Sequence, residues 1–170
     1  LPFIILPRQS FSVLARFWVR LMLLCVRVIL GIRYELQGTE NIPDGAAIFA
    51  SKHQSAWDVL VYNLIVPDCA YVLKRELMRI PLWGWYVWRI GMVAIDRSAG
   101  AKALKQMVTD ATALLDQGRS IVIFPQGTRR MHERLPFKDG AFRVASKRGS
   151  DLVPVSIEIP GDCWSSNWPL

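Results

Sequence analysis

The chain has 170 residues and a mass of 19.3 kDa, which is the size of a single domain. Hydrophobic residues make up 52% of the sequence and charged residues 21%, so the composition excludes disordered and fibrous proteins. The net charge is +7, and most of the basic residues are arginines, whose planar donor groups suit phosphates and lipid headgroups. The cysteines Cys25, Cys69 and Cys163 form no CxxC pair, so a disulfide scaffold and a zinc site both lack support.

Residues 1–34 differ from the rest of the chain, because they contain five arginines and no acidic residue. On a helix, Arg16, Arg20 and Arg27 fall on one narrow stripe. An arginine interrupts every apolar stretch before it reaches the roughly 18 residues that span a bilayer. The pattern therefore predicts an amphipathic helix that lies in a membrane interface, with its arginines at anionic headgroups. The side chains expected in the acyl region are Phe17, Trp18, Leu21, Leu23, Leu24, Val28 and Ile29.

Strands and helices alternate after residue 34. The apolar residues after Ser98 recur at helical spacing and predict a helix capped by Ser98. The alternation indicates an α/β fold, a layered and mostly parallel sheet flanked by helices, with ligand sites in loops beyond the carboxyl ends of the strands. The other expected elements are the strand Ala46–Ser51, a helix over 56–66, the strands Ala70–Leu73, Met92–Ile95 and Ser120–Phe124, the helix Gly140–Lys147 and the strand Leu152–Ile159.

Aromatic residues crowd the middle of the chain, where Trp83, Trp85, Tyr86 and Trp88 occur within six residues. Trp and Tyr concentrate at membrane boundaries, so we interpret this stretch as a second membrane-contacting element or as a wall for an acyl chain. The alternatives are an ordinary aromatic core here and, in residues 1–34, a core helix whose arginines pair with acidic groups elsewhere.

His53 and Asp58 are the first candidates for catalysis. His53 is expected in a loop after a strand, and Asp58 in the first turn of the following helix. Across that turn the carboxylate can hold one imidazole nitrogen and leave the other as a general base. No Ser or Cys stands in a Gly-x-Ser-x-Gly nucleophile elbow, so a substrate hydroxyl is the expected nucleophile. As an isolated pattern, His-x4-Asp also arises by chance.

Two further segments suit a phosphate group. The sequence Phe-Pro-Gln-Gly-Thr-Arg-Arg, residues 124–130, ends a predicted strand and supplies a glycine, a hydroxyl and paired guanidinium groups. Lys74 and Arg75 follow another strand and add positive charge. Each segment taken alone is also compatible with a solvated loop.

The order of these segments is more specific than any one of them. The His-x4-Asp pattern at 53–58, Lys-Arg-Glu-Leu at 74–77, the 124–130 segment and Val-Pro-Val at 153–155 together resemble the glycerolipid acyltransferase family over roughly residues 35–160. The predicted membrane-interface segment covers 1–34, and the resemblance implies an acyltransferase domain over 35–170. Relatives usually continue past the fourth segment, so further elements that close the sheet are expected beyond residue 170.

The resemblance also implies roles for individual residues. His53 would act as general base and Asp58 would orient it, while a glycerol hydroxyl attacks the thioester of acyl-CoA or of acyl-carrier protein. Lys74 and Arg129 would bind the phosphate of the acceptor. Gly127 and Thr128 would shape that loop, and Arg97 is a further candidate for phosphate binding. No metal site and no cofactor beyond the acyl donor are expected, and the positive-inside tendency favours the cytoplasmic face of the inner membrane.

One departure from the family concerns Gln126, where the third segment more often has Glu, so the role of this position is open. The favoured function is transfer of an acyl group to 1-acylglycerol 3-phosphate, a lysophospholipid, giving phosphatidic acid. The alternatives are a sister enzyme that acylates glycerol 3-phosphate or another lysolipid, and a monotopic lipid-binding protein on an anionic membrane. Nucleic acid is the least favoured partner, because the charge is concentrated in an apolar helix.

Overall fold

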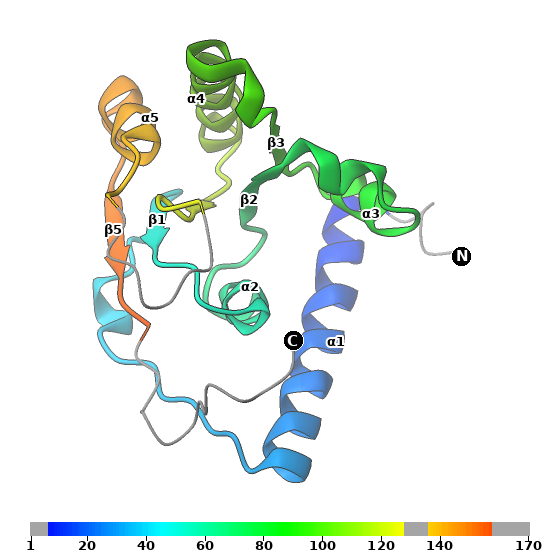
Figure 1. The fold of residues 1–170 in the computed structure, drawn as a ribbon. Helices are drawn as coiled ribbons and strands as arrows, with labels where there is room; N and C mark the ends of the chain where they lie inside the picture. Colours follow the sequence, from blue (N-terminus) through cyan, green and yellow to red (C-terminus); the bar gives the residue numbers. More distant parts are fainter. Residues whose placement is uncertain (1–6, 128–135, 158–170) are drawn as a thin grey trace.

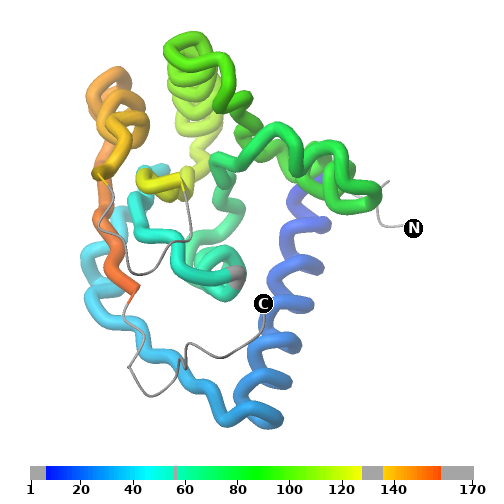
Figure 2. Tube along the Cα trace, in the orientation of Figure 1, coloured from blue at the N-terminus to red at the C-terminus, as the bar shows by residue number. Residues whose placement is uncertain are grey.

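The computed structural model describes residues 7–127 and 136–157, which form a layered α/β fold (Figure 1). The strand order is β3-β2-β4-β1-β5, and each described pairing is parallel. The expected fold class is therefore confirmed. The strands are β1 (Ile48–Ser51), β2 (Ala70–Lys74), β3 (Val93–Ile95), β4 (Ile121–Ile123) and β5 (Leu152–Val155). Figure 2 traces the chain from β1, in cyan, to its neighbour β5, in orange.

Helices cover both faces of the sheet. Alternate strand residues point to opposite faces, so Ile48 packs against α4 and α5 whereas Phe49 packs against α2. Helix α1 packs on the outer side of α2, through contacts of Val19 and Leu23 with Val61. The helices are α1 (Arg8–Leu30), α2 (Ala56–Ile65), α3 (Trp83–Arg89), α4 (Gly100–Asp116) and α5 (Gly140–Arg148), with short 3₁₀ turns η2 (Thr39–Asn41), η3 (Arg75–Arg79) and η4 (Arg97–Ala99).

Ion pairs tie the start of α1 to the sheet. Arg8 pairs with Asp68 in the loop before β2, and Asp68 in turn lies 3.6 Å from the buried guanidinium of Arg119. Arg119 also donates hydrogen bonds to the carbonyls of Ile90 and Gly91, at 2.8 and 3.0 Å. These contacts join the first turn of α1, the start of β2 and the end of α3 at one point, so the N-terminal end of α1 is attached to the sheet.

Some local expectations were wrong. Ser98 does not cap α4; the Asp96 side chain accepts hydrogen bonds from Ser98 and opens η4, and α4 begins two residues later. Leu23 was expected in the acyl region but is buried against α2, because it shares the helix face of Val19. The last strand ends at Val155, and positions 158 and 159 lie outside the described residues.

Candidate active site

The His53 and Asp58 side chains meet across the turn between β1 and α2. His53 lies in the loop after β1, and Asp58 lies in the first turn of α2. The Nδ1 atom of His53 is 3.1 Å from Oδ2 of Asp58, which confirms the expected pairing. An Nδ1–H that donates to the carboxylate leaves Nε2 as the ring nitrogen with a lone pair.

Asp58 is almost fully buried and accepts several hydrogen bonds. Its Oδ2 accepts from the backbone N–H groups of Gln54 and Ser55 at 2.6 and 2.8 Å, and its Oδ1 accepts from the Ser55 hydroxyl at 2.9 Å. Burial alone would raise the pKa of this carboxyl, but the hydrogen bonds from His53, Ser55 and Gln54 outweigh it and hold the pKa below its ordinary value. Asp58 is therefore an ionised, fixed partner for His53.

Aromatic packing fixes the other side of the imidazole. The ring of His53 stacks on that of Phe124, with 4.3 Å between centroids and 24° between planes. Phe124 in turn meets the edge of the buried Tyr62 at 6.3 Å. Burial raises the pKa of Tyr62 to about 12, so its hydroxyl stays protonated at neutral pH. The imidazole is thus held by a carboxylate at Nδ1 and by a ring at its face.

The topology places this pair where parallel sheets bind ligands. β1 and β4 are neighbours, yet the helix after β1 covers one face of the sheet and the helix after β4 covers the other. A crevice opens outside the carboxyl ends of two such strands. His53 follows β1 and Phe124 follows β4, so both stand at the edge of this crevice.

A cavity of about 1700 Å³ extends from this edge. Its walls come from α1, α2, α3 and α4, from β2 and from the turn after β4, and most of the side chains that line it are apolar. His53 lines it together with Lys74, Arg97 and Gly127. The volume exceeds the roughly 300–1,000 Å³ of most small-molecule pockets, which leaves room for a long hydrocarbon chain.

The basic candidates are held by neighbouring groups at the cavity rim. Lys74, half exposed, pairs with Glu76 at 3.1 Å. Arg97 donates from Nη1 to the Gly127 carbonyl oxygen at 2.6 Å, so it also fixes the turn after β4. Gly127 has a φ of +66°, a conformation that favours glycine. Thr128 and Arg129 lie outside the described residues.

A family model described as Acyltransferase matches residues 33–158, most of the chain. The chain belongs to the acyltransferase family. It is 36% identical over 169 residues to a 1-acyl-sn-glycerol-3-phosphate acyltransferase of Pseudomonas aeruginosa, covering 96% of this chain and 65% of that protein. It is also 36% identical over 140 residues to the human 1-acyl-sn-glycerol-3-phosphate acyltransferase alpha, covering 81% of this chain and 50% of that protein.

A solved acyltransferase has the same fold. The crystal structure of PlsC, the 1-acyl-sn-glycerophosphate acyltransferase of Thermotoga maritima, superposes with a TM-score of 0.65 at 26% identity. The match covers 85% of this chain and 56% of that one. The chain thus spans between about half and two thirds of the length of these relatives. The matched family region begins just after α1 and contains both His53 and Asp58.

The residues expected to contact a membrane lie on two helices, α1 and α3. Trp18 lies on the exposed side of α1 and also lines the cavity, as does Trp83 of α3. Trp85 and Trp88 are exposed but lie outside the cavity lining. On α1, Arg20 and Arg27 are exposed and Arg16 is half-buried. None of the described helices combines the length and apolar character of a membrane span.

Residues 7–127 and 136–157 contain no group of three or more His, Cys, Asp or Glu side chains arranged to hold a metal ion. Sequence reasoning overlooked Ser55, whose backbone and hydroxyl both hold Asp58, although Ser-x-x-Asp before an apolar run is a helix-start pattern. It also gave no role to Phe124 beyond its place in a segment. No sequence pattern predicts a stack between residues so far apart in the chain.

Proposed function

We propose that the protein transfers an acyl group from a thioester to the free hydroxyl of 1-acylglycerol 3-phosphate and so produces phosphatidic acid. The observation that carries the proposal is the His53–Asp58 pair at the rim of a large apolar cavity, in a chain of the acyltransferase family. The names of the relatives from Pseudomonas aeruginosa and human support the choice of acceptor.

His53 acts as the general base in this proposal. Its Nε2 takes the proton of the acceptor hydroxyl as that oxygen attacks the thioester carbonyl carbon. The tetrahedral intermediate collapses, the carbon–sulfur bond breaks, and the thiolate leaves and takes the proton from the imidazolium. Asp58 stabilises the positive charge that His53 carries between these steps, because it is ionised and 3.1 Å away.

The acceptor phosphate binds at the basic rim. Lys74 and Arg97 line the cavity with His53, and Gly127 lets the backbone approach a ligand closely. Thr128 and Arg129 follow directly in the chain and complete this group in the proposal. The apolar walls take the acyl chains. The donor is an acyl thioester, either acyl-CoA or acyl-carrier protein.

The α1 helix attaches the enzyme to an anionic membrane surface at the cytoplasmic face of the inner membrane. Its side away from α2 exposes large apolar residues, and the stripe of Arg16, Arg20 and Arg27 runs beside them. Trp83, Trp85 and Trp88 add an aromatic contact near the cavity. The apolar residues on that side of α1 that are more than half exposed are Val13, Phe17, Trp18, Leu24, Val28 and Ile29.

The test of the reaction is acyl transfer from a radiolabelled thioester to lysophosphatidic acid in detergent or vesicles. We expect phosphatidic acid from the wild type and at least about a hundredfold less from His53→Ala, the loss typical of removing a general base. Thermal unfolding of both proteins checks that the variant is folded. A folded wild type that binds lysolipid and acylates no glycerolipid would contradict the proposal and favour a lipid-binding protein.

The membrane contact is tested by sedimentation with vesicles that contain anionic lipid. Replacing Arg20 and Arg27 by Gln should weaken binding about thirtyfold, because each of the two cations contributes about 1 kcal/mol near such a surface. Lys102→Gln with Lys105→Gln removes the same charge from α4 on the other side of the sheet and is the matched control. Equal losses in both variants would show that general charge, and not α1, holds the membrane.

A further inference from the structure

The loop between β1 and α2 brings several donors to one oxygen atom. Oδ2 of Asp58 accepts from the backbone N–H groups of Gln54 at 2.6 Å and Ser55 at 2.8 Å. Nδ1 of His53 lies 3.1 Å from the same atom. Ser55 belongs to the helix-start motif of α2, so its bond to Asp58 forms within that turn. Gln54 stands one residue further out, so its N–H meets the carboxylate because the loop curls back toward α2.

The side chain of Gln54 leaves this loop in another direction. Its Nε2 donates to the carbonyl oxygen of Ile157 at 3.2 Å, across 103 positions of the chain. Ile157 follows β5, and β5 pairs with β1 in parallel as far as Val155, opposite Ser51. The two segments therefore leave the sheet side by side, and the Gln54 side chain joins them just beyond the ladder of backbone hydrogen bonds.

The loop after β1 is thus supported from both neighbouring strands, because the strand order is β4-β1-β5. Phe124, just after β4, stacks on the ring of His53. Ile157, after β5, holds the side chain of the next residue, Gln54. One contact fixes the plane of the imidazole, and the other fixes the backbone beside it. The geometry of the His53–Asp58 pair therefore depends on β5 as well as on β4.

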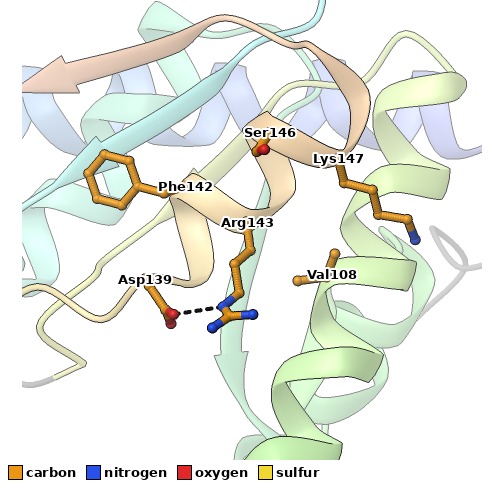
Figure 3. A pocket seen from close by; sticks show the side chains of 6 residues that line it. All are labelled: Val108, Asp139, Phe142, Arg143, Ser146 and Lys147. Atoms are coloured by element: carbon orange, nitrogen blue, oxygen red, sulfur yellow. Dashed lines mark hydrogen bonds and ion pairs between the residues drawn. The ribbon is translucent and has the colours of Figure 1, made fainter.

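Hydrogen bonds on the outer surface differ from this one in range. Figure 3 shows Arg143 of α5 beside Asp139, to which its Nε donates at 2.6 Å. The two residues are one helical turn apart, and both side chains are more than half exposed. Such a pair contributes little and joins no distant segments. The bond from Gln54 to Ile157, by contrast, is partly buried and fixes the position of a loop.

We propose that Gln54 is a positioning residue for the acyl transfer: its side chain, anchored on the Ile157 carbonyl, keeps the loop curled so that Asp58 holds His53 in place. This inference rests on the proposed function and deepens it. A side-chain amide suits the position, because its NH₂ group donates to a carbonyl and adds no charge beside the Asp58 carboxylate.

Steady-state kinetics of acyl transfer to lysophosphatidic acid test the proposal. Gln54→Met keeps the length of the side chain and removes the donor. We expect kcat to fall about fivefold to tenfold, the effect of one hydrogen bond, with KM for both substrates within about twofold of the wild type. Gln54→Asn keeps the amide but is too short to reach Ile157, so kcat should fall as much. A wild-type kcat in either folded variant would overturn the inference.

The matched control is Gln106→Met on α4. Gln106 is exposed and donates from its side-chain amide to Asp110 at 2.7 Å, so the control also loses an amide hydrogen bond. It should keep the kcat of the wild type. Thermal unfolding of every variant checks that the samples are folded.

A double-mutant cycle asks whether Gln54 acts through Asp58. Added to Asp58→Asn, the Gln54→Met change should leave kcat nearly unchanged, because the carboxylate that Gln54 helps to place is already gone. A structural role elsewhere would lower kcat by the same factor in both backgrounds. That result would overturn the inference.

A spectroscopic measurement needs no turnover. In proton NMR of the full-length protein, the Nδ1–H of His53 should give a low-field signal that is absent from His53→Ala. The signal should broaden or disappear in Gln54→Met and Gln54→Asn, because the N–H then exchanges with water, and should persist in Gln106→Met. An unchanged signal in both Gln54 variants would overturn the inference. Its loss in those variants, with a wild type that acylates no lysophosphatidic acid, would retain the positioning of His53 by Gln54 and refute the proposed function.

Discussion

The two faces of the sheet have different kinds of side chain beneath their helices. Under α4 and α5 the buried contacts are apolar, with Met107, Ala111 and Leu115 packed on strand residues such as Ile121. Under α2 the buried groups include the carboxylate of Asp58 and the hydroxyls of tyrosines and of Ser51. One face therefore contributes mainly stability, and the other holds polar groups in position at the cost of some apolar packing.

The largest effect is expected from a cavity on the apolar face. Leu115 is fully buried, so Leu115→Ala should lower the free energy of unfolding by about 2–5 kcal/mol. The kcat of the protein that remains folded should not change. Denaturant unfolding and acyl transfer on the same samples check both statements. Two results would contradict this contrast between the faces. One is a kcat of Leu115→Ala that falls in proportion to its stability, and the other is a loss of stability in His53→Ala as large as that in Leu115→Ala.

A smaller loss of stability, combined with a loss of activity, is expected from Asp58→Asn. The variant loses the negative charge of the carboxylate, which His53, Gln54 and Ser55 stabilise. The free energy of unfolding should fall by about 1–3 kcal/mol, and kcat should also fall. The pKa of Asp58 is lower in the folded protein than its ordinary 3.8, so the ionised carboxylate stabilises the fold above that pH. The difference in the free energy of unfolding between the wild type and Asp58→Asn should therefore shrink as the pH falls below 3.8 and through the pKa of Asp58 in the folded protein. Unfolding curves that keep a constant gap between the two proteins down to acid pH would contradict the assignment.

The attachment of α1 should respond more locally. Leu23→Ala removes one of the few buried contacts between α1 and α2, and we expect a cost of about 1–2 kcal/mol, less than at Leu115 because α1 can open by itself. Hydrogen exchange should speed up in α1 and not in the sheet. Leu24→Ala, an exposed neighbour, is the control and should leave exchange unchanged. Faster exchange throughout the sheet would mean that α1 is part of the central core.

The smallest effect is expected at the turn after β4. Gly127→Ala places a Cβ 3.3 Å from the Arg97 guanidinium at a φ of +66°, so we expect about 1 kcal/mol of strain and a modest rise in KM for lysophosphatidic acid. Gly118→Ala introduces the same type of strain at a φ of +77° with no atom within 4 Å. The KM of this control should stay at the wild-type value, and a rise in both would assign the effect to stability alone.

Local patterns predicted much of this molecule. The strand positions, the α/β class and the contact between His53 and Asp58 follow from alternation and from a spacing that crosses one turn. Competing local interactions caused the error at Ser98, because Asp96 is also a helix-start residue and accepts the hydrogen bond.

Contacts between distant segments could not be predicted in this way. The stack of Phe124 on His53 depends on β4 being the neighbour of β1, and no local pattern gives the order of strands. Arg97 has the charge for a phosphate, but its hydrogen bond to the Gly127 carbonyl appears only in the structure. The buried position of Leu23 likewise depends on where α2 lies, since helical spacing alone does not say which apolar residues face a neighbour.

The strand order also has a consequence for how the chain assembles. β1 is made first, yet its partners are β4 and β5, since Ile48 pairs with Ile121 and Leu152. During synthesis β1 and the His53 loop therefore remain without their neighbours until the last third of these residues has left the ribosome, whereas β2 and β3 can pair early. Pairings between residues so far apart in the chain form slowly, and until they form the apolar β1 is exposed to aggregation. The nascent chain should need a chaperone or an early membrane contact until β4 is complete.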